Sequence, residues 1–141
     1  MIKVYTDGSC LGNPGNGGWA FLIINKNDIS YRAGFERNAT NNRMELMAAI
    51  KALEFLNQHN DINLNTDSNY VKQGITKWIF NWKKNNWKTS AKKVVKNSDL
   101  WIQLDDLQNN RNVKWNWVKG HAGNLGNERA DELARMGIEK I

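Results

Sequence analysis

The chain has 141 residues and a formal net charge of +6 at pH 7, with 40% hydrophobic and 24% charged residues. These proportions exclude an intrinsically disordered or collagen-like chain, and no apolar run of about 18 residues predicts a membrane span. A chain of this length holds about one core, so we expect a single domain over residues 1–141. The lone Cys10 cannot form an internal disulfide, and the polar N-terminal stretch is unlike a secretory signal, which favours a cytoplasmic protein.

Positive charge is concentrated in one segment. No acidic residue lies between Asp67 and Asp99, whereas this stretch carries Lys72, Lys77, Lys83, Lys84, Lys88, Lys92, Lys93 and Lys96. Three tryptophans, at positions 78, 82 and 87, are interleaved with these lysines. Because the rest of the chain is slightly acidic, the pattern favours a nucleic acid over a membrane surface as the partner. A solvated basic face with tryptophans in the core is the alternative.

The N-terminal part of the chain predicts three strands. Residues 2–7 alternate between apolar and polar side chains, which indicates a strand that ends at Gly8. Residues 10–18 contain four glycines and the only proline, and this composition predicts a loop. Residues 19–24 and 30–37 predict two further strands, so the N-terminal part should form an antiparallel meander.

Helical periodicity begins at residue 41. We expect a largely buried helix over residues 41–57, capped at its start by Thr40, Asn41 or Asn42. The pattern continues with a strand over 62–66, a helix over 98–109, a strand over 113–118 and a helix over 127–141. It is least regular over 74–96. The order β-β-β-α-β-α-β-α predicts an α/β fold, with a mixed sheet and helices on both faces.

Two aspartates occupy equivalent positions in this pattern. Asp7 and Asp67 each end a predicted strand just before a turn. If the two strands are parallel neighbours, both carboxylates lie at the carboxyl edge of the sheet, where open α/β sheets bind ligands. A single aspartate there is more often a turn or capping residue, so it is the pair that indicates a site.

Two further acids lie on predicted helices. Glu45 falls among Ala49, Ala52 and Leu56 on the helical wheel, and burying a carboxylate there costs several kcal/mol unless a partner compensates. The alternative is a first-turn glutamate that reaches solvent. Asp131 lies at the edge of the apolar stripe of the last helix, where an ordinary ion pair is the alternative.

Four such carboxylates in one cluster would require cations. Their hard oxygen atoms favour two Mg²⁺ ions, with Mn²⁺ as a substitute, and two histidines with one cysteine make no convincing zinc set. Two such ions activate a water and stabilise the leaving oxygen of a phosphoryl displacement. Together with the basic segment, this predicts a nuclease. His121, in a loop between glycines, could shuttle protons, although an ordinary loop histidine is the alternative.

An ordered set of motifs resembles the bacterial type 1 ribonuclease H family over almost the whole chain. The motifs are YTDGSCLGNPG, TNNRMELMAAI, NTDSNYV, GITKWIFNWKKNNWKT, VKNSDLW, VKGHAGN and NERADELAR. The resemblance implies the ribonuclease H-like fold, a mixed five-stranded sheet with helices on both faces and a basic protruding arm. It also implies hydrolysis of the RNA strand of RNA·DNA hybrids, leaving 5′-phosphate and 3′-hydroxyl ends.

The resemblance also assigns roles to individual residues. It implies that Asp7, Glu45, Asp67 and Asp131 hold the metal ions and that His121 is the mobile catalytic histidine. The residues implied to bind the hybrid are Asn13, Thr40, Asn41 and Asn42 on the DNA strand, Asn69 where many relatives carry Gln, and Trp78, Lys83, Lys84, Trp87 and Lys88 on the arm. Trp78 and Trp101 are expected in the hydrophobic base of the arm.

Two other functions remain open at this point. Transposases, integrases and junction resolvases share such a sheet with acidic residues, although their acidic sets differ and the basic arm argues against them. A nucleic-acid-binding module without catalysis would use the arm alone, but it would have no reason to keep carboxylates at buried helix positions. We expect a monomer in either case.

Overall fold

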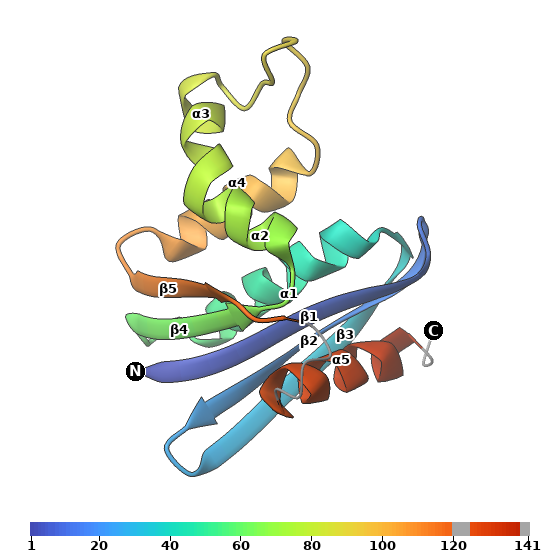
Figure 1. The fold of residues 1–141 in the computed structure, drawn as a ribbon, viewed down its shortest axis with the longest axis vertical. Coiled ribbons are helices and arrows are strands. Elements are labelled where there is room, and N and C mark those ends of the chain that lie inside the picture. Colours follow the sequence, from blue (N-terminus) through green and yellow to red (C-terminus); the bar gives the residue numbers. More distant parts are fainter. Residues whose placement is uncertain (120–124, 139–141) are drawn as a thin grey trace.

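The computed structural model describes residues 1–119 and 125–138, and five strands in this part form one sheet (Figure 1). They are β1 (Ile2–Gly12), β2 (Gly15–Asn25), β3 (Asp28–Ala39), β4 (Asp61–Thr66) and β5 (Asn112–Trp117). Their order across the sheet is β3-β2-β1-β4-β5. Strands β1, β4 and β5 are parallel to one another, whereas β2 is antiparallel to both β1 and β3. The predicted mixed sheet is therefore confirmed.

Helices cover both faces of this sheet, as predicted. The helices are α1 (Asn41–Phe55), α2 (Asn69–Gln73), the π-helix η1 (Gly74–Trp78), α3 (Ile79–Lys84), α4 (Ser98–Gln108) and α5 (Leu125–Ile138). Helix α1 packs on one face with α4 against it, and α5 packs on β1 and β2 from the opposite face (Figure 1). Residues 74–97 project away from the sheet, and we refer to them as the arm.

The predicted boundaries of the first two strands are wrong. The first strand does not end at Gly8, and residues 10–18 are not a loop. Strand β1 continues to Gly12 and pairs with β2 as far as Gly15, which leaves Asn13 and Pro14 as the turn. Gly12 has a φ of +79°, a backbone conformation that glycine adopts without strain. Pairing between the two strands satisfies the backbone of this glycine-rich stretch, whose composition alone is typical of a loop.

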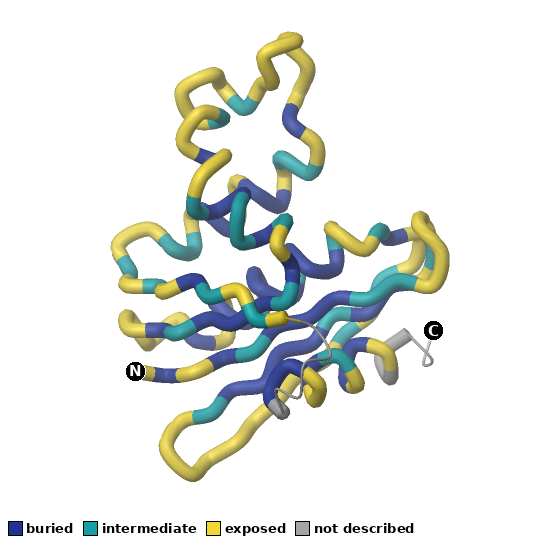
Figure 2. The backbone as a smooth tube through the Cα atoms, viewed as in Figure 1, coloured by how far each residue is buried: buried dark blue, intermediate teal, exposed yellow. Residues whose placement is uncertain are grey.

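The main core lies between the sheet and α1, with α4 closing it beside the arm. Val4, Leu46, Ile50, Leu53 and Leu64 are fully buried there. In contrast, the tip of the arm and the β2–β3 hairpin end are exposed (Figure 2). Burial of α1 agrees with its predicted apolar stripe, but the helix ends at Phe55 rather than at residue 57.

The base of the arm is aromatic. Trp101 of α4 is fully buried, and its ring lies 5.2 Å from that of Tyr70 and 5.3 Å from that of Trp82. Gly74 makes room for it, because a Cβ there would lie 2.0 Å from the Trp101 ring. Trp78 joins this cluster at its edge and is 41% exposed. Residues 69–84 form helices that pack on Trp101, which is distant in the chain. This explains why their own sequence lacks a regular helical pattern.

Arg111 connects the ends of two helices. Its guanidinium donates hydrogen bonds to the main-chain oxygens of Leu53 and Leu56 at the end of α1, of Leu107 in α4, and of His59. A cation at the carboxyl ends of helices is also favoured by their dipoles. Burial lowers the pKa of Arg111 without a carboxylate to oppose it.

We therefore expect Arg111→Ala to lower the free energy of unfolding by about 2–4 kcal/mol, since it leaves several carbonyls without a charged donor. Urea unfolding followed by circular dichroism measures this loss. Arg37→Ala, at an exposed position of β3, is the matched control and should change stability by less than about 0.5 kcal/mol. Equal stability of the two variants would contradict a capping role for Arg111.

Candidate metal and nucleic-acid site

Parallel pairing of β1 and β4 brings two of the predicted carboxylates together. Thr6 pairs with Thr66, so that Asp7 and Asp67, the next residue of each strand segment, lie side by side. Asp67 begins the connection from β4 to α2, where the Ser68 side chain accepts a hydrogen bond from the amide of Val71. Asp7 instead lies inside β1, because that strand continues to Gly12.

Glu45 reaches the same place from α1. Its carboxylate accepts a hydrogen bond from the main-chain amide of Gly8, which follows Asp7 in β1. The strand and the helix approach so closely here that a Cβ on residue 8 would lie 2.2 Å from the carbonyl carbon of Met44. Gly8 therefore allows the contact that places Glu45 beside Asp7, a role that its position in the sequence does not reveal.

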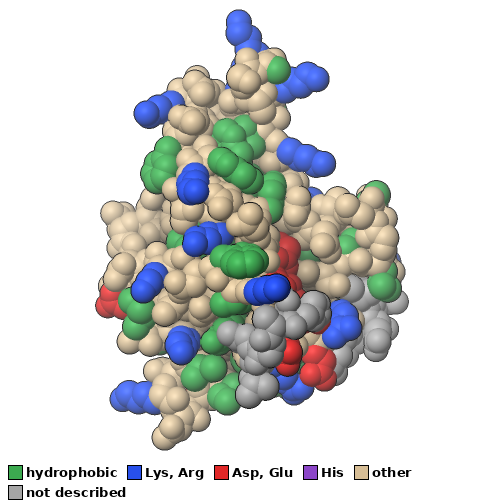
Figure 3. All heavy atoms as spheres, in the orientation of Figure 1, with side chains coloured by type: hydrophobic (Ala, Val, Ile, Leu, Met, Phe, Trp, Pro, Cys, Tyr) green, Lys and Arg blue, Asp and Glu red, His purple; other side chains and the backbone are tan. Residues whose placement is uncertain are grey.

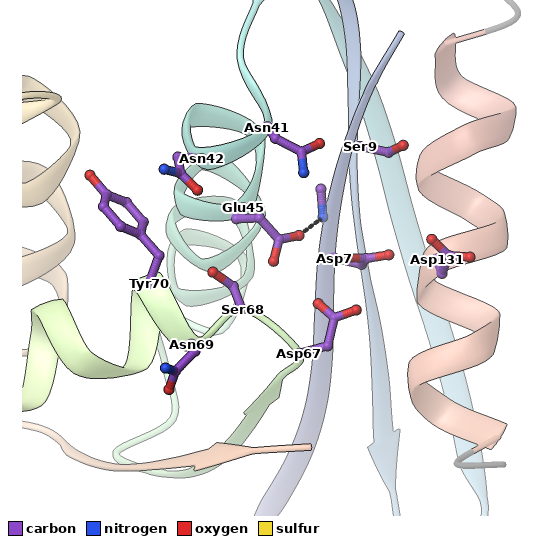
Figure 4. A pocket seen from close by; sticks show the side chains of 11 residues that line it. Asp7, Ser9, Asn41, Asn42, Glu45, Asp67, Ser68, Asn69, Tyr70 and Asp131 are labelled. Atoms are coloured by element: carbon purple, nitrogen blue, oxygen red, sulfur yellow. Dashed lines mark hydrogen bonds between the residues drawn. The ribbon is translucent and has the colours of Figure 1, made fainter. Parts of the chain in front are cut away.

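The three carboxylates form an acidic cluster in which Asp7 and Glu45 are buried and Asp67 is half-buried. One oxygen atom from each of Asp7, Glu45 and Asp67 lies within 4.8 Å of the other two (Figure 4). Asp7 is 3% exposed and Glu45 is 7% exposed. Burial raises the pKa of both side chains. The negative charge of Glu45 raises the pKa of Asp7 further, and the negative charge of Asp67 raises that of Glu45.

A cation fits this cluster chemically. Within the part of the chain that the structure describes, Oδ2 of Asp7 is buried without a hydrogen-bond partner. An unpartnered buried carboxylate oxygen is costly, and a hard divalent ion would satisfy it. The donor set consists of carboxylate oxygens, which Mg²⁺ and Mn²⁺ prefer.

Asp131 borders the cluster from the opposite side. It lies on α5, across from Asp7, and it lines the same pocket of about 420 Å³ (Figure 4). Its carboxylate forms an ion pair with Arg135 one helical turn further on, at 3.0 Å between Nη2 and Oδ2. The structure thus brings three of the four predicted ligands into one set and places the fourth across the pocket, where its carboxyl group interacts with Asp7 and, in addition to burial, raises the pKa of Asp7.

Polar residues line the rest of this pocket. Asn41, Asn42 and Asn69, which the sequence indicated, lie in it. Ser9, Ser68 and Tyr70 also line it, although no sequence signal distinguished them from ordinary capping or core residues. The sequence therefore indicates the charged part of the pocket but not the part of its polar wall that Ser9, Ser68 and Tyr70 form.

The start of α1 contacts the β1–β2 hairpin. Thr40 is the N-cap, and its side chain accepts a hydrogen bond from the amide of Arg43 at 3.3 Å. The Asn13 side chain accepts one from the amide of Asn41 at 3.1 Å. Asn13 and Thr40 thus lie next to the pocket rather than in it. The other main-chain amides at this start of α1 suit a phosphate group.

The predicted arm residues lie apart from the carboxylates. Lys84, Lys88 and Lys92 surround a polar hollow of about 490 Å³ on the arm, and Figure 3 shows basic side chains projecting from this part of the molecule. Lys83 instead forms an ion pair with the buried Asp105 of α4, at 3.0 Å. Trp87 packs on Trp82 with ring centroids 6.3 Å apart.

His121 lies outside the described residues, so the structure gives no account of its position. None of the helices described is long and apolar enough to cross a membrane.

Trp117 ends β5 beside the cluster, where its indole donates a hydrogen bond to the main-chain oxygen of Asp67 at 3.1 Å. This contact fixes the connection that carries Asp67.

Comparison with known proteins gives consistent similarities. Residues 1–139 match the family model described as RNase H. The chain is 54% identical to a protein named Ribonuclease H from Pseudomonas fluorescens, over 99% of this chain and 93% of that protein. It is 56% identical to a Ribonuclease H from Francisella tularensis subsp. novicida, over 99% and 92% of the two chains. The crystal structure of LC9-RNase H1, a type 1 RNase H with the type 2 active-site motif, superposes with a TM-score of 0.87 at 33% identity, covering 99% of this chain and 72% of that one.

Proposed function

The chain belongs to the ribonuclease H family, and from that premise we propose that it is an endonuclease that hydrolyses the RNA strand of RNA·DNA hybrids. The products carry 5′-phosphate and 3′-hydroxyl ends. The observation that carries the proposal is the set of Asp7, Glu45 and Asp67 oxygens within 4.8 Å of one another, of which the first two side chains are buried. Such a set has little structural value without cations, and it lies in a pocket open to a large substrate.

We propose two Mg²⁺ ions as the cofactors, with Mn²⁺ as a substitute. When bound, they supply an activated water and charge stabilisation for the leaving oxygen. Asp7, Glu45 and Asp67 would hold them, with Asp131 completing the set from α5. Arg135 forms an ion pair with Oδ2 of Asp131 at 3.0 Å, which would leave the other oxygen of this carboxylate for the metal.

The protein itself binds and orients the hybrid. Asn13, Thr40, Asn41 and Asn42 present polar groups and helix amides to a phosphate of the DNA strand. Asn69 lines the pocket from α2, where its side-chain amide can donate and accept hydrogen bonds to the hybrid. The basic residues of the arm attract a second stretch of phosphates, with Trp78 and Trp87 supporting this surface. Recognition of 2′-hydroxyls would distinguish the RNA strand from the DNA strand.

The decisive experiment compares three duplexes of one sequence. We expect cleavage of the RNA strand in RNA·DNA with Mg²⁺, none in RNA·RNA or DNA·DNA, and none of any duplex in chelator. Readdition of Mg²⁺ should restore activity, which controls for damage by the chelator. Comparable cleavage of double-stranded DNA would contradict the hybrid-specific function, and hybrid binding without cleavage would favour a module that only binds.

The arm lysines provide a test of the binding surface. Replacing Lys84, Lys88 and Lys92 with Ala should weaken hybrid binding and lower the slope of log affinity against log salt by about one unit or less for each lost phosphate contact. Fluorescence anisotropy over a salt series measures both. Cleavage at saturating hybrid should largely survive, because these residues do not contact the carboxylates.

Lys83 is the matched control for these lysines. Its ion pair with buried Asp105 indicates a structural contribution. Lys83→Ala should therefore lower the melting temperature and leave the salt slope of hybrid binding close to that of the parent. The sequence alone gave it the same role as its neighbours. An unchanged salt slope in the triple variant would remove the arm from the binding surface.

We propose that His121 moves a proton during cleavage, on the basis of its glycine-flanked sequence context. His121→Ala should lower the single-turnover rate by about 10²-fold, near the low end for general acid–base catalysis, because water replaces part of the function. Hybrid affinity and Mg²⁺ affinity should be unchanged. Rates measured from pH 6 to 9 test this, and a profile equal to that of the unmodified protein would make His121 an ordinary loop residue.

Three further proposals concern organisation. Residues 1–141 form a single domain, which the shared core of sheet, α1 and α4 supports. The protein acts as a monomer, since each copy carries both the carboxylate pocket and an arm. It acts in the cytoplasm, which the single cysteine favours.

A further inference from the structure

A continuous series of hydrogen bonds connects the first turn of α1 with the arm base and the pocket. The Arg43 guanidinium donates to both carboxylate oxygens of Asp99, at 3.0 and 2.8 Å, and to Oδ1 of Asn97 at 3.2 Å. Nδ2 of Asn97 donates to the hydroxyl of Tyr70 at 3.1 Å. The buried Trp101 indole donates to the same hydroxyl, also at 3.1 Å.

These residues come from three separate segments. Arg43 follows Asn42 in the first turn of α1, on the helix that carries Glu45. Tyr70 lies in the first turn of α2, shortly after Asp67, and lines the carboxylate pocket. Asn97 and Asp99 lie where the chain returns from the arm into α4. The network therefore joins the helix start, the pocket and the arm without using a metal ligand.

The geometry of the network is specific. Two parallel hydrogen bonds between a guanidinium and a carboxylate fix both the distance and the relative orientation of the two groups. The hydrogen bond from Arg43 lowers the pKa of Asp99, as expected for a persistent contact. Asn97 has a φ of +62°, a left-handed conformation that asparagine adopts more readily than most residues other than glycine. Its side chain both accepts from Arg43 and donates to Tyr70, so it links the two residues.

We propose that Arg43, Asn97 and Tyr70 are positioning residues that set the arm relative to the carboxylate pocket, so that one hybrid contacts both at once. This inference rests on the proposed function, because it assumes that arm and pocket bind the same duplex. Two contacts at a fixed separation act as linked binding sites, and their joint affinity depends on how well the separation is maintained. Loosening the network should weaken binding of hybrids that reach both sites.

Two conservative substitutions test the network. Tyr70→Phe keeps the ring among Trp78 and Trp101 but removes the hydroxyl that accepts both hydrogen bonds. Arg43→Lys keeps the charge but cannot form the paired contact with Asp99. The matched controls are Tyr31→Phe on the exposed face of β3, and Arg129→Lys, which is in an exposed ion pair with Glu132. Thermal unfolding verifies that all four variants fold.

The readout is the KM for two hybrids, one long enough to span pocket and arm and one that occupies the pocket alone. For the long hybrid we expect KM to rise about 5- to 10-fold in Tyr70→Phe and Arg43→Lys, the effect of one or two lost hydrogen bonds. For the short hybrid, KM should not change in Arg43→Lys, and the kcat and Mg²⁺ affinity of this variant should be those of the parent, because Arg43 does not line the pocket. The double variant should be no worse than the more affected single one, since both changes break one network.

Three results would overturn the inference: a long-hybrid KM equal to that of the controls, an equal rise for both hybrids in Arg43→Lys, or additive effects in the double variant. Affinities of the two hybrids measured in chelator give the same comparison without cleavage. If the parent protein bound hybrids but did not cleave them, the proposed function would fail, whereas the binding comparison would still decide the role of the network.

Discussion

Replacing Asp7 with Asn is expected to abolish Mg²⁺-dependent cleavage while leaving the protein folded. The substitution removes a carboxylate whose Oδ2 is buried without a hydrogen-bond partner in the described part of the chain. Loss of a ligand affects the metal ions that make the reaction possible, so we expect single-turnover rates to fall by at least about 10³-fold. Isothermal titration should show a parallel loss of Mg²⁺ affinity.

The free energy of unfolding of the Asp7→Asn variant should not fall together with its activity. In the folded chain, burial raises the pKa of Asp7 to about 12 and that of Glu45 to about 8. The folded state therefore binds more protons than the unfolded state, whose carboxyl groups titrate near pH 4. As a consequence, the free energy of unfolding falls as the pH rises from about 4 through 8. Asn at position 7 removes this penalty, so the variant should be as stable as the parent or more stable in chelator.

Urea unfolding from pH 5 to 8 in chelator measures this dependence. The parent should lose stability across this range, the Asp7→Asn variant should lose less, and Mg²⁺ should reduce the loss in the parent only. The exposed Asp28→Asn is the matched control and should keep both the activity and the pH dependence of the parent. Full activity in the Asp7→Asn variant would show that Asp7 holds no metal.

Replacing Gly8 with Ala is expected to damage both the fold and the site. The added Cβ would lie 2.2 Å from the carbonyl carbon of Met44 and 2.3 Å from the amide nitrogen of Glu45. Both neighbours are backbone atoms, so strand β1 and helix α1 must move apart. We expect unfolding to become easier by about 3 kcal/mol, at the upper end for an overpacked core.

The same displacement should separate Glu45 from Asp7. A shift of about 1 Å can cost about 10²-fold in rate, so cleavage and Mg²⁺ affinity should both fall even under conditions where the variant is folded. Lys3→Ala, at an exposed position of the same strand, should change neither. A Gly8→Ala variant with the Mg²⁺ affinity of the parent would show that the close approach of β1 and α1 does not position Glu45.

Local sequence patterns predicted most of the elements. Alternation in residues 2–7 and helical periodicity from residue 41 depend on neighbours within the same element, and both correspond to observed structure. The arm was harder to predict, because its helices form around Trp101, which is distant in the chain. The lysines there also look alike in sequence, although only Lys83 among the arm lysines faces a buried carboxylate in an ion pair that the structure describes.

The sequence by itself determined the family and the chemical character of the site. Asp7 and Asp67 in matching positions, and Glu45 on an apolar helix face, indicated a buried carboxylate cluster that needs cations. Only the tertiary structure decided how the cluster is built. The pairing of β1 with β4 and the contact of Gly8 with α1 bring the oxygens within 4.8 Å, while Asp131 lies across from Asp7 on α5 (Figure 4). The physical reason is that residue type and periodicity are local properties, whereas such distances depend on how two segments pack against each other.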